Sequence, residues 1–191
     1  SGWQERIQPY LRATGWVASD YFQALARAEC DLAICYWPVG RCDLDIDTSA
    51  CTYRVIGHER LIPVTGRKND GSACALLPGA RQQPVPWLAY PKRGLLGSAV
   101  KAHLARLPQS TYLTAQSENL YAAGIKELVL LGYGMSWLPE RNVAAELADG
   151  TLVRAGDSRW DVPMELRLYR HQSQHHAELD SLWGQLSPPR L

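Results

Sequence analysis

The cysteines are the residues of this chain whose type best suits redox or metal chemistry. They are five in number, an odd count, and no two of them form a Cys-x-x-Cys pair: Cys30, Cys35, Cys42, Cys51 and Cys74. Structural zinc sites need closely spaced pairs, and a disulfide framework is unusual in a chain with this much apolar core. We therefore predict reduced, mostly buried thiols. A redox-sensing thiol is the alternative, with Cys42 or Cys51 as its candidates, because both lie in a polar loop where a thiolate would be exposed.

Histidines and aspartates offer a second set of potential ligands. His171 and His175 are four residues apart, as metal ligands on one helix face often are, but no cysteine or carboxylate lies at ligand spacing beside them. Asp43, Asp45 and Asp47 alternate like calcium ligands, yet the closing Gly and Glu of an EF-hand loop do not follow in register. We read both groups as solvated surface residues and expect no metal and no cofactor.

Bulk properties narrow the class of protein further. The chain has no Gly-x-Ser-x-Gly elbow, no P-loop and no Gly-x-Gly-x-x-Gly after its first strand, so we predict that it is not an enzyme. Its formal net charge is +1 and its densest basic piece is Arg67-Lys68, which excludes nucleic-acid binding by a basic face of these residues. No apolar run approaches the roughly 18 residues that cross a membrane, and the N-terminus is unlike a secretory signal. We expect a cytoplasmic protein.

Strands and helices alternate along the chain. Ser19-Asp20 can cap a helix whose apolar residues keep helical spacing, and the apolar run Asp31 to Trp37 is typical of a buried strand ended by Pro38. By such signals we predict strands at 7–13, 31–37, 52–57, 59–64, 85–90, 110–115, 135–138, 151–154 and 161–169, with the third and fourth as two strands or one bent strand. We predict helices at 19–28, 95–107, 118–131, 140–148 and 177–186. This alternation indicates an α/β sandwich with a largely parallel sheet.

The stretch from Leu128 to Val153 is the most organised part of the sequence. An apolar helix end runs into Gly132-Tyr-Gly134, and a short apolar strand ends at Pro139 before a second helix begins. A glycine after a helix can adopt the left-handed conformation that a helix C-terminus requires. We predict that Gly132 and Gly134 allow a tight turn and that Trp137 anchors the strand behind a ligand cleft.

The order of these pieces resembles the effector-binding domain of LysR-type transcriptional regulators. In that family an apolar helix ends in a Gly-x-Gly turn, a strand ends in Leu-Pro, a helix leads into a Gly-Lys-Leu-Val-like step, and a Pro-x-x-Leu strand follows. Here the matching segments read Leu131-Gly-Tyr-Gly-Met-Ser-Trp-Leu-Pro139, Glu146-Leu-Ala-Asp-Gly-Thr-Leu-Val153 and Pro163-Met-Glu-Leu-Arg-Leu-Tyr-Arg170. Earlier in the chain, Glu29-Cys-Asp-Leu-Ala-Ile34 and Glu59-Arg-Leu-Ile-Pro-Val64 also fit the family. The Trp-Leu-Pro and Leu-Tyr-Arg forms are most similar to the subgroup that includes hypochlorite-responsive regulators.

The resemblance implies a two-lobed α/β fold like that of periplasmic binding proteins, with a ligand in a hinge cleft. Lobe one would take residues 1–63 and 160–191, and lobe two residues 64–159. The family's first strand and helix of lobe one have no counterpart at the start of this sequence, and neither has its N-terminal winged helix-turn-helix. We therefore expect these residues alone not to bind an operator.

Candidate ligand contacts follow from this topology, because ligands of parallel α/β sheets lie beyond the carboxyl ends of the strands. We predict ligand binding by Trp16, Tyr36, Trp37, Tyr90, Lys92, Arg93, Ser117 and Met135. Tyr36 and Trp37 can stack on a ring, although Trp37 can equally cap the core. Lys92 and Arg93 precede a helix N-terminus and suit an anion, although a solvated basic loop is equally consistent. Ser117 has the residue type of an N-cap for the helix that follows it.

The resemblance also implies partners. We expect a small-molecule effector, anionic or aromatic, a homodimer that becomes a tetramer in the full-length protein, and DNA contact only through an N-terminal helix-turn-helix. Dimerisation would use the helices at about 19–28 and 118–131, the second through the small and apolar side chains of Leu120, Ala123, Gly124, Glu127, Leu128 and Leu131. Two alternatives remain open. One is a stand-alone solute-binding protein of similar fold, and the other is an oxidant sensor that acts through a cysteine.

Overall fold

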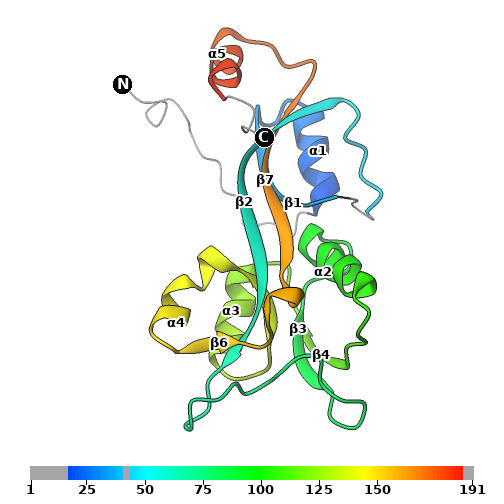
Figure 1. The fold of residues 1–191 in the computed structure, drawn as a ribbon. Coiled ribbons are helices and arrows are strands. Elements are labelled where there is room, and N and C mark those ends of the chain that lie inside the picture. The colour runs from blue at the N-terminus through cyan, green and yellow to red at the C-terminus, as the bar shows by residue number, and fades with distance from the viewer. Residues whose placement is uncertain (1–16, 41–43, 187–191) are drawn as a thin grey trace. The chain divides into compact units, whose positions relative to one another are not determined.

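The computed structural model describes residues 17–40 and 44–186, and its elements are shown in Figure 1. The chain divides into two compact units. Within these described ranges, unit one comprises residues 17–35, 45–56 and 167–186, and unit two comprises residues 36–40, 44 and 57–166. The lobes predicted from the sequence divide the chain near residues 63 and 160, and they stay a prediction.

Unit one is held together by aromatic side chains between two helices and a small sheet. Its helices are α1 (Ala18–Ala26) and α5 (Ala177–Gln185), and in its sheet β7 (Val162–His171) lies between β1 (Ala33–Pro38) and β2 (Cys51–Gly66). Phe22 of α1 meets Tyr169 of β7 edge to face, with ring centroids 4.9 Å apart. The guanidinium of Arg170 lies 4.7 Å from the Trp183 ring of α5, which anchors that helix. Both β2 and β7 continue into unit two.

Unit two contains the remaining elements. Its strands are β3 (Val85–Ala89), β4 (Leu113–Glu118), β5 (Ser136–Pro139) and β6 (Leu152–Arg154). Its helices are α2 (Leu95–Arg106), α3 (Ala122–Leu130) and α4 (Ala144–Ala148), with the 3-10 turns η2 (Glu140–Asn142) and η3 (Ser158–Trp160).

The strand pairings of unit two are mixed. β2 pairs antiparallel with β5 through Leu61 and Pro139, and antiparallel with β6 through Val64 and Arg154. β3 runs parallel to β4, and a further parallel bridge joins Trp87 of β3 to the residue before β5. The prediction of a largely parallel sheet is therefore corrected. The α/β class is confirmed, because parallel strands joined through helices are present beside the antiparallel pairs.

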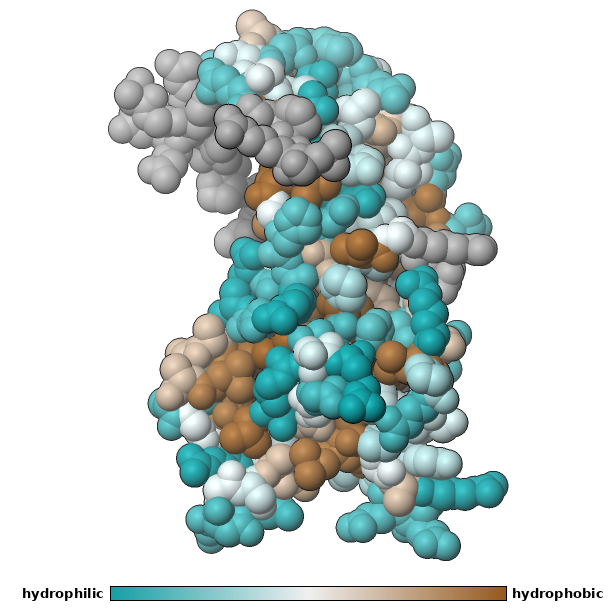
Figure 2. Space-filling view, viewed as in Figure 1, coloured by the Kyte–Doolittle hydropathy of each residue, from teal (hydrophilic) through white to brown (hydrophobic). Residues whose placement is uncertain are grey.

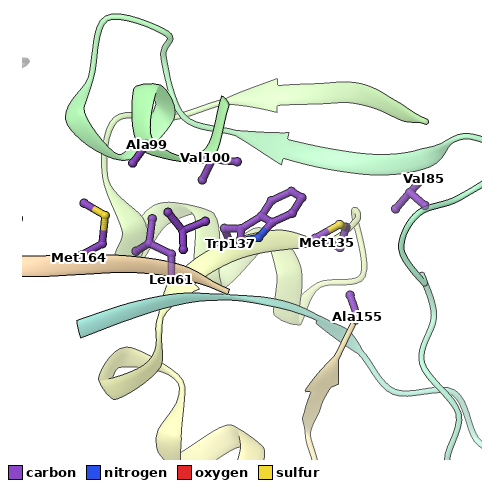
Figure 3. Packing of buried hydrophobic residues seen from close by; sticks show 9 residues of the cluster. Leu61, Val85, Ala99, Val100, Met135, Trp137, Ala155 and Met164 are labelled. Carbon is purple, nitrogen blue, oxygen red and sulfur yellow. The ribbon is translucent and has the colours of Figure 1, made fainter. Parts of the chain in front are cut away.

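Two apolar clusters form the core of unit two. The first surrounds the fully buried Trp137 of β5; Figure 3 shows its indole beside Met135, with Val100 of α2 nearby. The indole Nε1 donates a hydrogen bond of 2.8 Å to the carbonyl oxygen of Trp160, so the ring is fixed at its polar end as well. The second cluster buries Ile125 and Val129 of α3 completely. Trp137 thus anchors β5, as the sequence predicted.

The glycine turn after α3 is confirmed in detail. Gly132 and Gly134 have positive φ angles of 82° and 155°. A Cβ at Gly134 would come within 2.7 Å of the Pro86 carbonyl oxygen, so the chain must approach β3 without a side chain there. Helix α3 ends as the Gly132 N–H binds the Val129 carbonyl and the Tyr133 N–H binds the Leu128 carbonyl.

Other boundaries differ from the prediction. The helix predicted at 118–131 begins only at Ala122, because residues up to Glu118 belong to β4 and pair with β3. The segments 52–57 and 59–64 form one strand, β2, and the helix predicted at 140–148 is divided into η2 and α4. The strand predicted at 7–13 lies outside the described residues. Among those that the structure describes, no helix is long and apolar enough to cross a membrane.

Candidate functional site

Three strands of unit two end at the same edge. β3 and β4 are parallel and in register at their ends, where Ala89 pairs with Glu118. The segment that leads into β5 lies along β3 in the same direction, because the Leu88 N–H binds the Met135 carbonyl oxygen at 2.9 Å. The carboxyl ends of such strands are where α/β proteins place ligands. This edge, which we call the carboxyl edge, is followed by Tyr90 after β3 and by Glu140 after β5.

Four polar side chains gather at the carboxyl edge: Tyr36, Glu59, Tyr90 and Arg141. Burial raises the pKa of the Tyr36 hydroxyl, the charge of Glu59 raises it further, and the charge of Arg141 opposes the rise. Burial also raises the pKa of the Tyr90 hydroxyl, and the nearby Tyr36 adds to that rise. Glu59 and Arg141 are in direct contact through their side chains. The segments that carry them are joined by the antiparallel pairing of β2 with β5.

Both oxygens of the Glu59 carboxylate accept hydrogen bonds. Glu59 is 7% exposed, and its two oxygens accept from the Arg60 N–H at 2.9 Å and from the Arg141 side chain. Arg141 also donates to the His58 carbonyl oxygen at 3.3 Å. Burying a carboxylate is costly unless it is paired and hydrogen-bonded. Glu59 therefore holds Arg141 at the edge.

The Tyr90 hydroxyl is the exception at the edge. The residue is 3% exposed, and its oxygen is buried without any hydrogen-bond partner. Its ring packs in the second apolar cluster, beside the buried Leu88 and Leu138. Buried hydroxyls almost always have a partner, so the Tyr90 hydroxyl has a hydrogen bond left to donate.

A second ionic network fixes the neighbouring backbone. Arg60 of β2 contacts Glu140 of η2 at 2.7 Å and the buried Asp161 at 3.3 Å, and Arg154 of β6 also pairs with Asp161. These contacts join β2, β6, η2 and the segment before β7. Strand β2, which carries Glu59, and turn η2, which carries Arg141, are thereby held in one arrangement.

The structure brings together only part of the predicted site. Tyr36 contributes to the raised pKa of Tyr90, and the loop after Tyr90 exposes Lys92 and Arg93 ahead of α2. Neither cation forms an ion pair within the described ranges. Met135 is completely buried in the first apolar cluster, which Figure 3 shows.

The remaining predicted residues lie elsewhere or have other roles. Trp37 is 8% exposed and belongs to the buried core residues. Ser117 is exposed within β4, so the prediction that it caps the following helix is wrong. The side chain of Asn119 instead accepts from the Tyr121 N–H, at 2.9 Å, before α3 begins. Trp16 lies outside the described residues.

Glu59 and Arg141 were missed by sequence reasoning. They are 82 positions apart, and only the antiparallel pairing of β2 with β5 brings them together. The signal that was available is the position of each charge: Glu59 directly precedes an apolar strand core, and Arg141 lies two residues after a Leu-Pro strand end.

In the part of the chain that the structure describes, the cysteines and histidines give no second site. Burial, and then the charge of Asp47, raise the pKa of the Cys51 thiol, which disfavours a reactive thiolate. Cys42 lies outside the described residues. In residues 17–40 and 44–186, no three His, Cys, Asp or Glu side chains come together as a metal site requires.

Comparison with known proteins identifies the family. The sequence profile of the family described as "LysR substrate binding domain" matches residues 13–187. The chain belongs to the LysR substrate binding domain family. This family consists of regulatory domains and is not an enzyme family.

Two curated relatives are transcription regulators. One is the "HTH-type transcriptional regulator YjiE" of Escherichia coli strain K12, 26% identical over 130 residues, which cover 66% of this chain and 41% of the relative. The other is the "HTH domain-truncated transcriptional regulator QseD" of Escherichia coli O157:H7, with the same identity and 51% of its length covered. The LysR substrate binding domain described here thus spans about half the length of these relatives.

A solved structure confirms the fold. The regulatory domain of HypT from Salmonella typhimurium in its apo form superimposes with a TM-score of 0.74 at 19% identity, covering 90% of this chain and 78% of that one. A bromide-bound form of the same domain gives a TM-score of 0.66 at 20% identity, covering 90% and 77%. At these identities the likeness establishes the two-lobed, periplasmic-binding-protein-like fold of LysR regulatory domains.

Proposed function

We propose that this chain is the regulatory domain of a LysR-type transcription regulator and that it binds a small-molecule effector at the carboxyl edge of unit two. The observation that carries the proposal is the family match over residues 13–187. The geometry supports it at one place, where Tyr90 follows β3 and Arg141, paired with Glu59, follows β5. Effector binding would bias an equilibrium between conformations that exist before binding.

Three further sequence predictions become part of this proposal. The effector contacts Tyr36, Tyr90, Lys92 and Arg93, and the bromide-bound HypT domain shows that a relative holds a small anion. The domain forms a homodimer, through a surface that includes α3. DNA is bound only by an N-terminal helix-turn-helix of the full-length protein, which acts in the cytoplasm.

The dimer surface has support in the exposure of α3. Ala123 and Glu127 are exposed, whereas Ile125 and Val129 face the core. Leu131 at the end of the helix is 71% exposed. Figure 2 shows apolar side chains at the surface of unit two over α3 and α4. Exposed apolar patches of this kind commonly mark interfaces.

The experiment that tests the proposal uses the complete gene. Its product should carry a helix-turn-helix of roughly 60 residues before the position of Ser1, the usual size and place of such modules. Binding of that product to its own promoter DNA should change when a cell extract containing small metabolites is added. A gene product without a DNA-binding module, like the HTH domain-truncated QseD, would reject the DNA-binding part. Promoter binding unaffected by any metabolite fraction would reject the effector part.

A further inference from the structure

The orphaned Tyr90 hydroxyl indicates what kind of group binds at the carboxyl edge. A buried hydroxyl without a partner destabilises the folded domain unless something outside the chain satisfies it. In unit two, Ser136 donates to the Leu88 carbonyl at 2.7 Å and Trp137 donates to the Trp160 carbonyl at 2.8 Å, whereas one oxygen of Glu146 and the Tyr90 hydroxyl are buried without a partner. Glu146 binds Lys126 through its other oxygen. The Tyr90 hydroxyl has no partner at all, and it lies at the strand end where a ligand is expected.

The polar side chains around Tyr90 include free hydrogen-bond donors but few free acceptors. Both Glu59 oxygens already accept hydrogen bonds. The Tyr36 hydroxyl forms no hydrogen bond to another described residue. Burial raises the pKa of both tyrosines, and Glu59 raises that of Tyr36 further, so both hydroxyls keep their protons at neutral pH. Both hydroxyls can therefore donate to an incoming group.

The loop after Tyr90 carries positive charge. Lys92 and Arg93 are exposed in this loop and are separated from Tyr90 by Pro91. The next residues begin α2, a helix of 12 residues whose first N–H groups have no intrahelical partners. The first turn of α2 packs closely against the loop. A Cβ at Gly97 would lie 2.2 Å from the Pro91 carbonyl oxygen and 3.0 Å from the Tyr90 carbonyl oxygen.

We propose that Tyr90 is the buried hydrogen-bond donor of an anion-binding subsite, which the Tyr36 hydroxyl and the cations of the 92–93 loop complete. The ligand, or the part of it that binds here, is a small group that only accepts hydrogen bonds: a halide, an inorganic oxyanion or a carboxylate. This inference rests on the proposed effector function and adds the chemistry of the effector. A cation is disfavoured, because the carboxylates of Glu59 and Asp161 are already paired with arginines.

The test compares the chain with its Tyr90→Phe variant by thermal unfolding. Phenylalanine keeps the buried ring and removes only the orphaned hydroxyl, so the ligand-free variant should melt about 2–4 °C higher than the wild type. Tyr169→Phe is the matched control, because that buried hydroxyl accepts from Arg167 at 3.2 Å. Its removal should lower the melting temperature.

The ligand arms use sodium bromide, sodium sulfate and sodium benzoate at constant ionic strength, which separate halide, oxyanion and carboxylate. At least one should stabilise the wild type in a saturable way. The Kd of that anion should increase roughly tenfold to a hundredfold in Tyr90→Phe, as expected for a lost hydrogen bond to a charged group. The Tyr169→Phe control should keep the wild-type Kd.

Each other result overturns the inference. If none of the three anions stabilises the wild type, the subsite does not bind anions. If the Kd is equal in wild type and Tyr90→Phe, Tyr90 is not the donor. If ligand-free Tyr90→Phe melts lower than the wild type, the hydroxyl has a structural partner such as a buried water. All three results leave the proposed regulatory function standing, because that function is tested by promoter binding of the full-length gene product.

Discussion

At the scale of single residues, the chemistry of this domain lies in polar groups on the strand ends. Tyr36 and Tyr90 contribute donors, and Glu59 fixes Arg141 beside them. Such groups are costly to bury, and a fold retains them only where they are paired or where a ligand pairs with them. The carboxyl edge contains both cases within a few residues.

Cysteine reactivity can be predicted at the same scale. Burial and the neighbouring Asp47 raise the pKa of the Cys51 thiol, so its thiolate fraction at neutral pH falls below that of an ordinary cysteine. We expect Cys51 to react more slowly with hypochlorite and with iodoacetamide than the exposed Cys74. Mass spectrometry of peptides after timed quenching measures both rates in one sample. Faster modification of Cys51 would restore the oxidant-sensor alternative.

How much of the site the sequence could predict depended on the kind of contact. Tyr36 and Tyr90 were predicted because each lies at or near the end of a recognisable strand, and strand ends can be located from local patterns. Glu59 and Arg141 were not, because a pair 82 residues apart depends on strand pairing that no local pattern contains. The error at Ser117 has the same origin: pairing with β3 extends β4 through residues whose local signals favour a helix start.

At the scale of elements, the alternation of strands and helices was predicted nearly throughout, whereas the pairing directions were not. Apolar periodicity identified α1, α2 and α5 within a few residues. It carried no information on direction, and β2 runs antiparallel to β5 and β6. Direction is decided by connections, and β2 is a long strand that belongs to both compact units.

The turn between α3 and β5 gives an element-scale prediction. Gly132→Ala places a Cβ in open space and adds only the strain of a positive φ, about 1 kcal/mol of destabilisation. Gly134→Ala adds a contact of 2.7 Å with the Pro86 carbonyl, which moves β5 away from β3. We expect it to destabilise the domain by about 2–4 kcal/mol. Urea unfolding measures both variants, and equal losses would contradict the close approach.

The link between α3 and α4 should make stability depend on pH. The Lys126 ammonium binds Glu146 and lowers the pKa of that carboxyl below its ordinary value of 4.5. A depressed carboxyl pKa stabilises the fold above the ordinary value, and this contribution is lost as the pH falls through the folded-state pKa. Lys126→Met should therefore melt at a lower temperature at pH 6 and lose less on acidification to pH 3.5. The exposed Lys101→Met of α2 is the control, and superimposable pH profiles for the three proteins would exclude the link.

At the scale of the whole molecule, β2 and β7 are the strands through which a signal at the carboxyl edge could spread. Glu59 and Arg60 lie on β2, and Asp161 directly precedes β7. Within unit two, Arg60 connects these strands by pairing with Asp161 and Glu140. A ligand that draws Arg141 away from Glu59 would thus change a network attached to both strands. Such a network supports coupling, and a measured change of state is what would establish it.

Self-association is the prediction that belongs to the molecule as a whole. Leu131 is 71% exposed at the end of α3, and Tyr133 beside it is 61% exposed. If this surface is the dimer interface, Leu131→Glu buries an unpaired charge in it and should weaken the dimer at least tenfold, the equivalent of about 1.4 kcal/mol or more. Leu76→Glu is the matched control, because Leu76 is also an exposed leucine of unit two, at 60%. Sedimentation velocity over a concentration series should show a dimer for the wild type and the control, and monomer for Leu131→Glu with an unchanged melting temperature of the monomer fold. A wild-type chain that is monomeric at all concentrations, or equal weakening by both variants, would place the interface elsewhere.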